Sequence, residues 1–184
     1  MRIAVLISIA MLASEPANAG VVVVNQDTGR NCYLQTLADA SPENIQRGLS
    51  ICSQAITDSG DDPYDRAAAL VNRADIRLRV PDFPGVVSDA DAAIALEPSI
   101  AEAYANRGAG LIGERKFNEA LVALNKAVDL ESPKSEIAYY NRAIAKEALG
   151  DVKGAYYDFK AANEINSRFS LASEQLARFR VIKH

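Results

Sequence analysis

Hydrophobic residues in this chain recur at intervals of three and four positions, the spacing of one face of an amphipathic helix. One stretch shows the spacing in five positions: Ala120, Leu121, Leu124, Ala127 and Val128. Alternation of apolar and polar residues does not persist long enough to predict a sheet. The run Val21 to Val24 favours an extended backbone, but a single four-residue segment cannot form a sheet. The pattern predicts an all-helical fold.

The helical pattern repeats along the chain. An Asn-Arg pair followed by a small residue occurs at Asn72, Asn106 and Asn141, at spacings of 34 and 35 residues. The extra residue in the second interval falls in a predicted loop at 132–134. Three further sets share this register: Val86, Ala120 and Ala155; Ala93, Ala127 and Ala162; Leu96, Leu130 and Ile165. A period of this length with two helices per unit predicts a stack of helical hairpins.

Each unit contains a break between its two helices. The breaks fall at 80–84, 114–117 and 149–152, where prolines or a glycine end the first helix. Asp82 and Asp151 are predicted to cap the helices that follow.

The best preserved positions are Tyr104, Gly108, Phe117, Ala120, Ala127 and Leu130. Together with the period, they resemble the tetratricopeptide repeat (TPR) family of helix-turn-helix units. The resemblance covers about 67–168, although Leu70, Arg77 and Lys146 stand where an aromatic residue is usual. It implies an all-α fold, an α-solenoid with a right-handed superhelical twist and a concave groove lined by the first helix of each pair.

The resemblance also organises the rest of the chain. We expect three TPR units at 67–100, 101–135 and 136–168. Residues 30–66 are expected to form a degenerate N-terminal hairpin, preceded by an extended arm at 20–29. Residues 169–184 are predicted to form a helix that covers the apolar face of the last unit, because a solenoid needs such a cap.

Residues 1–19 have the pattern of a signal peptide. Arg2 is followed by an apolar run from Ile3 to Leu12, and Ala17-Asn18-Ala19 forms a small-x-small cleavage site before Gly20. A transmembrane anchor is the alternative, but this run is about half of the roughly 20 apolar residues that span a bilayer. We therefore expect cleavage after Ala19, an exported protein that is periplasmic or secreted, and no membrane span after cleavage.

Export allows the two cysteines, Cys32 and Cys52, to form a disulfide. Ser41 and Pro42 read as the start of a helix that follows a helix at about 31–40. Pro42 lies ten residues from each cysteine, so the two would sit at the same height in an antiparallel hairpin. The spacing predicts a Cys32–Cys52 disulfide, and two free buried thiols are the alternative.

Charge and composition narrow the chemistry. With 20 basic and 24 acidic side chains spread along the chain, no basic face is expected, so nucleic acid is not an expected partner. The only histidine is His184, which leaves no base for a Ser-His or Cys-His site and no histidine cluster for a metal. We expect no catalytic residues, no metal and no cofactor; a hydrolase that uses carboxylates alone is the less favoured alternative.

Three glycines match a nucleotide-binding fingerprint literally: Gly108, Gly110 and Gly113. That fingerprint requires a preceding strand and a helix that begins within it. Neither is expected here, so we interpret these glycines as helix positions where another backbone approaches closely. Each glycine lowers helix stability by about 1 kcal/mol relative to alanine, which predicts local flexibility.

The TPR resemblance implies a binding role for Asn72, Asn106 and Asn141, because the matching asparagines of the family project into the groove and bond a peptide backbone. Bonding within the solenoid is the alternative. Helical spacing places six further residues beside them: Val71, Asp75, Ala105, Ala109, Tyr140 and Ile144. Tyr140 is the expected aromatic anchor for a ligand. The arginines after the asparagines are expected to be structural and to pair with carboxylates such as Asp89 or Asp158.

The expected function is a protein-protein interaction module or adaptor in the cell envelope that binds another protein or a peptide. Some family members clamp an acidic C-terminus with basic groove residues, but the matching positions here carry Ala68, Asp75, Glu102 and Ile144. We therefore expect an internal or basic segment as the ligand, and a chain that is a monomer or a weak homo-oligomer. A structural protein that self-associates through its apolar surface is the alternative.

Overall fold

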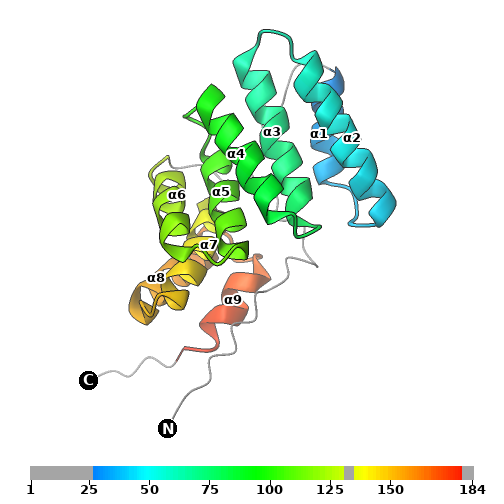
Figure 1. Ribbon diagram of the computed structural model, residues 1–184. Coiled ribbons are helices and arrows are strands. Elements are labelled where there is room, and N and C mark those ends of the chain that lie inside the picture. Colours follow the sequence, from blue (N-terminus) through cyan, green and yellow to red (C-terminus); the bar gives the residue numbers. More distant parts are fainter. Residues whose placement is uncertain (1–26, 131–134, 180–184) are drawn as a thin grey trace, which may run out of the picture.

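The computed structural model describes residues 27–130 and 135–179, and within them every regular element is a helix (Figure 1). The helices are α1 Asp27–Thr36, α2 Pro42–Asp58, α3 Pro63–Leu78, α4 Phe83–Leu96, α5 Ala101–Gly113, α6 Phe117–Asp129, α7 Ser135–Ala148, α8 Val152–Ile165 and α9 Ser170–Leu176. The prediction of an all-helical fold is confirmed.

Helices that follow one another pack as hairpins, and the hairpins stack in chain order from α1 to α9 (Figure 1). The first helix of each hairpin also packs against the first helix of the next, so that α3 contacts α1 and α5, and α5 contacts α7. This arrangement is an α-solenoid, as predicted. No helix in the described ranges is long and apolar enough to cross a bilayer, and the predicted leader lies outside those ranges.

Short polar side chains start the second helices where the sequence predicts them. Ser41, Asp82 and Asp151 each accept a hydrogen bond from the backbone N–H three residues later, at 3.4, 3.1 and 2.8 Å. Each cap satisfies a donor that the first turn of a helix leaves without a partner.

The helices do not coincide with some of the expected boundaries. The limit between 66 and 67 falls inside α3, because Asp62 caps a helix that already begins at Pro63. Residues 27–29 of the expected arm belong to α1, and residues 20–26 lie outside the described ranges. The helix expected at about 31–40 ends at Thr36, because residues 37–41 form the turn that leads to the cap at Ser41.

The small residues of the repeat register form the spine between the hairpins. Val86, Ala120 and Ala155 are completely buried, and Ala93, Ala127 and Ala162 are almost so. Small side chains let neighbouring helices approach closely at these positions. The third set differs, because Ile165 at the end of α8 is exposed.

The C-terminal segment packs on the last hairpin. Phe169, Leu171, Leu176 and Phe179 contact a core cluster that contains Tyr140 and Phe159. The helix itself is shorter than expected, because α9 ends at Leu176 and is followed by turns up to residue 178. Residues 180–184 of the expected helix lie outside the described ranges.

The three glycines of α5 lie inside a helix, which excludes the strand-to-helix turn of the nucleotide fingerprint. The expected close backbone is wrong, however. A Cβ atom at Gly108 would meet Leu124, one at Gly110 would meet Val87, and one at Gly113 would meet the Phe83 ring, at 2.4, 2.9 and 2.3 Å. These glycines therefore make room for side chains of α4 and α6.

Candidate peptide-binding face

The residues predicted to bind a peptide come from three neighbouring helices. We call them the asparagine face: Val71, Asn72 and Asp75 on α3; Ala105, Asn106 and Ala109 on α5; Tyr140, Asn141 and Ile144 on α7. Because α3 packs against α5 and α5 against α7, the repeat register places the three asparagines on adjacent helices. Their side chains differ in hydrogen bonding.

Asn106 bonds within the solenoid. Its Nδ2 atom donates to the backbone carbonyl of Val71 at 3.1 Å, and the side chain is buried. The bond joins α5 to α3, the first helix of the preceding hairpin, and gives the buried amide of Asn106 a hydrogen-bond acceptor. For Asn106, the structure therefore agrees with the alternative reading of the sequence.

Asn72 has the same position on α3 and a different environment. It is 3% exposed, and its Nδ2 atom has no hydrogen-bond partner in the described part of the chain. The preceding first helix, α1, ends at Thr36 and supplies no carbonyl to this donor. A buried donor without a partner costs on the order of 1–3 kcal/mol, so Asn72 carries an unused capacity to bond.

Asn141 is also buried, at 5% exposure. Around the asparagines, Val71, Ala105 and Ala109 are buried, and Asp75 pairs with Arg79 at 3.7 Å. Ile144 is half-buried and packs against the apolar cluster that contains Leu111 and Leu124. The asparagine face is therefore buried except for the half-buried Ile144, and it combines apolar side chains with three amides and the paired carboxylate of Asp75.

Tyr140 lies in the C-terminal core, which differs from the expected role as an exposed aromatic anchor. It is 1% exposed, and its ring packs edge-on against Phe159 and Phe169, with centroids 5.5 and 5.2 Å away. The reason is that α9 packs over this end of the stack.

The hydroxyl of Tyr140 is buried without a completed hydrogen bond. Burial is the largest effect on this phenol and raises its pKa. The nearby Gln175 side chain has a smaller, opposite effect on the pKa, although it does not form a full hydrogen bond with the hydroxyl.

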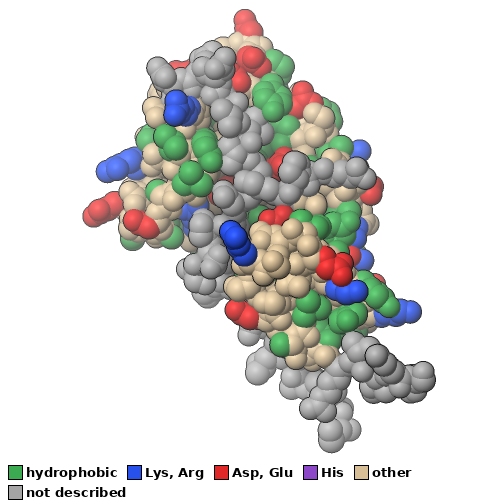
Figure 2. All heavy atoms as spheres, turned by 180° about the vertical axis from the view of Figure 1, so that it is seen from behind, with side chains coloured by type: hydrophobic (Ala, Val, Ile, Leu, Met, Phe, Trp, Pro, Cys, Tyr) green, Lys and Arg blue, Asp and Glu red, His purple; other side chains and the backbone are tan. Residues whose placement is uncertain are grey.

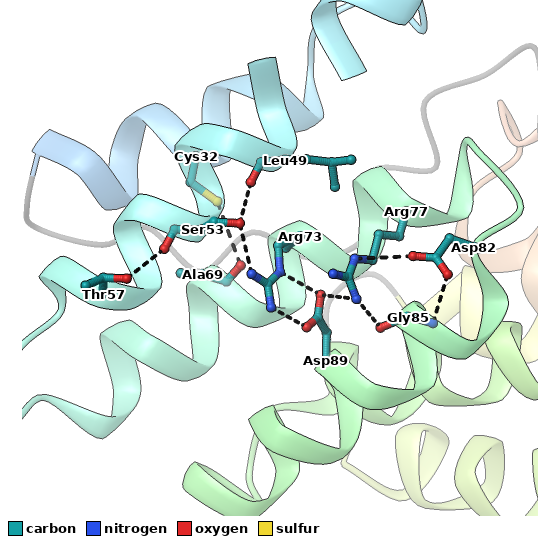
Figure 3. A network of polar contacts seen from close by, with 10 residues as sticks. All are labelled: Cys32, Leu49, Ser53, Thr57, Ala69, Arg73, Arg77, Asp82, Gly85 and Asp89. Atoms are coloured by element: carbon teal, nitrogen blue, oxygen red, sulfur yellow. Dashed lines mark hydrogen bonds and ion pairs between the residues drawn. The ribbon is translucent and has the colours of Figure 1, made fainter. Parts of the chain in front are cut away.

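The arginines after the asparagines join helices, as predicted. Arg73 holds Asp89 through two hydrogen bonds of 2.9 and 2.6 Å, and Arg142 holds Asp158 through two of 2.8 Å (Figure 3 shows the first pair). The hydrogen bonding of Arg142 to the Asp158 carboxylate raises the pKa of this arginine. Arg107 instead reaches back to Asp91 on α4 at 2.6 Å, because its own hairpin has Ala123 where the others have aspartate.

Arg77 and Lys146 stand where an aromatic residue is usual, and the sequence analysis did not predict the aspartates that they contact. Arg77 contacts Asp89 at 3.4 Å, and Lys146 contacts Asp158 at 2.8 Å. The middle hairpin has Leu111 at the matching position, opposite Ala123. The signal was available in the sequence, because a basic residue accompanies aspartate in two repeats and leucine accompanies alanine in the third.

Cys32 and Cys52 form a disulfide between α1 and α2, and both are completely buried. The two helices thus have the facing positions that the spacing around Pro42 predicts. The described residues contain no free cysteine and no group of three or more His, Cys, Asp or Glu side chains placed to hold a metal ion.

Charges are dispersed on the surface. Figure 2 shows acidic and basic side chains scattered among apolar and neutral ones on the face turned to the viewer. The ion pairs within the stack also prevent a basic patch, because carboxylates from neighbouring helices neutralise the arginines that could form one.

Comparison with known proteins supports the fold. No protein-family model matches the sequence, and no curated protein matches it. Among solved structures, the TPR domain of Arabidopsis OM64 superimposes with a TM-score of 0.59 at 24% sequence identity. The match covers 64% of this chain and 97% of that domain. The hairpin stack described above therefore has the fold of a TPR domain.

Proposed function

We propose that this chain is a protein-protein interaction module that binds an extended segment of another protein along the asparagine face. The observation that carries the proposal is the unpartnered Nδ2 atom of Asn72, a buried donor beside the apolar residue Val71. A peptide carbonyl would satisfy that donor once the side chains that cover Asn72 move aside, whereas the equivalent atom of Asn106 is already bonded to Val71. Asn72 is thus the principal binding residue in this proposal.

The surroundings favour apolar side chains in the ligand. Ala105 and Ala109 leave little side-chain volume on α5, and Val71 continues the apolar strip on α3. A bound backbone would be recognised through amide bonds, and alternate ligand side chains would contact this strip. Asn141 extends the same row to α7.

The setting is proposed as the cell envelope. The sequence pattern of residues 1–19 supports it, and so does the buried Cys32–Cys52 disulfide, because disulfides persist in oxidising compartments. The expected ligand remains an internal or basic segment. The proposed role involves no catalysis.

Peptide-array binding followed by titration tests the proposal. Asn72→Ala should weaken the selected peptide about tenfold, because a buried amide-carbonyl bond contributes roughly 1 kcal/mol or more. Asn118→Ala is the matched control, since Asn118 is exposed on α6. Equal loss in both variants, or a preference for acidic C-termini across the array, would contradict the proposal.

A second candidate function is self-association. Val122 on α6 and Tyr157 on α8 occupy the same repeat position and are 70% and 56% exposed. Exposed apolar side chains repeated on successive hairpins favour a contact between copies. Light scattering distinguishes the two functions: a mass that rises with concentration and falls in Tyr157→Ser favours self-association.

A further inference from the structure

Helix α1 is held to the stack in an unusual way. Its inward side carries Gly29, Cys32 and Thr36, and Cys32 is its only buried side chain of an apolar type. Leu34, the one leucine of α1, is 44% exposed. A ten-residue helix with so little apolar burial is marginal on its own.

Two polar or covalent connections hold α1 in place. The disulfide joins Cys32 to Cys52 on α2, and the sulfur of Cys32 lies 3.8 Å from the carbonyl oxygen of Ala69 on α3. At the C-terminal end of α1, the guanidinium of Arg79 donates to the carbonyl of Thr36 and to that of Ala38 in the following turn, the latter at 2.8 Å. Helix α1 is therefore held by a small number of specific contacts.

The remaining hairpins have cores of their own. Of the five apolar clusters in the described part of the chain, four contain no residue of α1. The fifth keeps Ile45, Ala55, Ala69 and Ile76 from α2 and α3 without it. The stack from α2 onward therefore has the packing to stay folded if α1 leaves.

We propose that the Cys32–Cys52 disulfide is a redox switch: its reduction by a dithiol releases α1 and uncovers the apolar faces of α2 and α3. A thiolate of the dithiol attacks one cysteine sulfur, forms a mixed disulfide and displaces the other as a thiolate. The second thiol of the reductant then displaces the first cysteine. Overall, the two cysteines gain two electrons and two protons, and the dithiol is oxidised to its disulfide.

Access to the buried sulfurs comes from opening of α1. Both sulfur-bearing residues are completely buried, so a reductant reaches them only when α1, the first helix of the described residues, frays. Arg79 opposes fraying by bonding the last carbonyl of α1, that of Thr36, and the carbonyl of Ala38 in the turn that follows. Release of α1 exposes Ala69 and Ile76, which lie beneath it. This inference does not rest on the proposed peptide binding.

Hydrogen exchange in dithiothreitol, with iodoacetamide to trap free thiols, tests the switch in the full chain. After both cysteines are alkylated, amide protection over 28–36 should fall about tenfold or more, while α3 to α8 keep theirs. Arg79→Gln should speed reduction about tenfold, because two charge-assisted bonds are lost. The double variant Cys32→Ala with Cys52→Ala should show the released α1 without reductant.

Three results would overturn the proposal. The first is an alkylated chain whose α1 amides stay as protected as in the oxidised chain. The second is loss of protection from all helices together, which would make the disulfide a requirement for the whole fold. The third is a disulfide that dithiothreitol does not reduce unless denaturant is added.

Discussion

The guanidinium of Arg73 and the carboxylate of Asp89 form a two-pronged ion pair between α3 and α4, with hydrogen bonds of 2.9 and 2.6 Å. Asp89 is almost completely buried, and Arg77 adds a second positive charge at 3.4 Å (Figure 3). Arg73 also donates to Ser53 on α2, so one side chain links two second helices. The same arrangement recurs in the third repeat, where Arg142 bonds Asp158 and Asn125.

Removal of the Asp89 carboxylate should destabilise the chain. Asp89→Ala removes the buried carboxylate that Arg73 and Arg77 share, although Arg73 keeps Ser53 and Arg77 keeps Asp82. We expect a loss of about 2 kcal/mol in the free energy of unfolding, because both arginines also retain some contact with water. Adding Arg77→Leu gives the combination found in the middle repeat, Leu111 with Ala123, and should restore more than half of the loss. Urea denaturation measures both effects.

The control for this prediction is Asp91→Ala. Asp91 pairs with Arg107, but half of its side-chain surface is exposed, so the expected loss is below about 1 kcal/mol. A loss as large as that of Asp89→Ala would show that burial does not distinguish the two pairs.

Arg115 stores backbone strain in the loop between α5 and α6. Its φ is 61°, in the left-handed region, where the matching residue of the third repeat is Gly150 with φ 88°. Arg115→Gly should therefore stabilise the chain by about 1 kcal/mol, and Gly150→Ala should destabilise it by a similar amount. Thermal unfolding of the two variants checks the opposite signs; a lower melting temperature for Arg115→Gly would refute the strain argument.

The contact between Gly108 and Leu124 predicts a coupled pair. A Cβ atom at Gly108 would lie 2.4 Å from Cγ of Leu124, which is completely buried, so Gly108→Ala should cost about 2 kcal/mol. The first repeat has Ala74 and Ala90 at these positions. In a Leu124→Ala background, Gly108→Ala should instead be neutral or stabilising. A double-mutant cycle without coupling would contradict this packing.

Tyr140 gives a pH dependence with a defined sign. Burial raises the pKa of its phenol above the usual value of about 10. Above pH 10 the unfolded chain therefore loses this proton before the folded chain does, and the free energy of unfolding falls as pH rises. Tyr140→Phe should remove that dependence, and at pH 7 it should be neutral or stabilising because it deletes a buried hydroxyl without a bond.

Chemical denaturation at pH 7 and pH 11 measures the contribution of Tyr140. Tyr157→Phe serves as the control, because Tyr157 is exposed. A Tyr140→Phe chain that loses stability between the two pH values as steeply as the parent chain would argue against the raised pKa.

Much of the fold follows from local pattern. The register of the asparagines locates the hairpins, the short polar residues locate the caps, and the distance of each cysteine from Pro42 predicts the disulfide. These features depend on residues close in sequence or on the repeat itself. The start of α3 was missed because Asp62 and Pro63 form a stronger start signal than the repeat boundary.

Other features depend on the offset and the angle at which adjacent hairpins pack, which the sequence pattern does not specify. The bond from Asn106 to Val71 needs the offset between α5 and α3, which no periodicity specifies. Tyr140 was expected beside the asparagines on an open face, but α9 packs over it. The sequence correctly placed the glycines of α5 in a helix. The side chains that pack against these glycines were identified only from the structure.

The central claim is that the asparagine face binds a peptide backbone and that Asn72 supplies the decisive donor. Nuclear magnetic resonance titration of the labelled chain with an array-selected peptide tests it most directly. The account predicts a large shift of the Asn72 side-chain NH2 signals, with backbone shifts confined to α3, α5 and α7. An unchanged Asn72 signal, with shifts on the outer residues of α6 and α8, would contradict it.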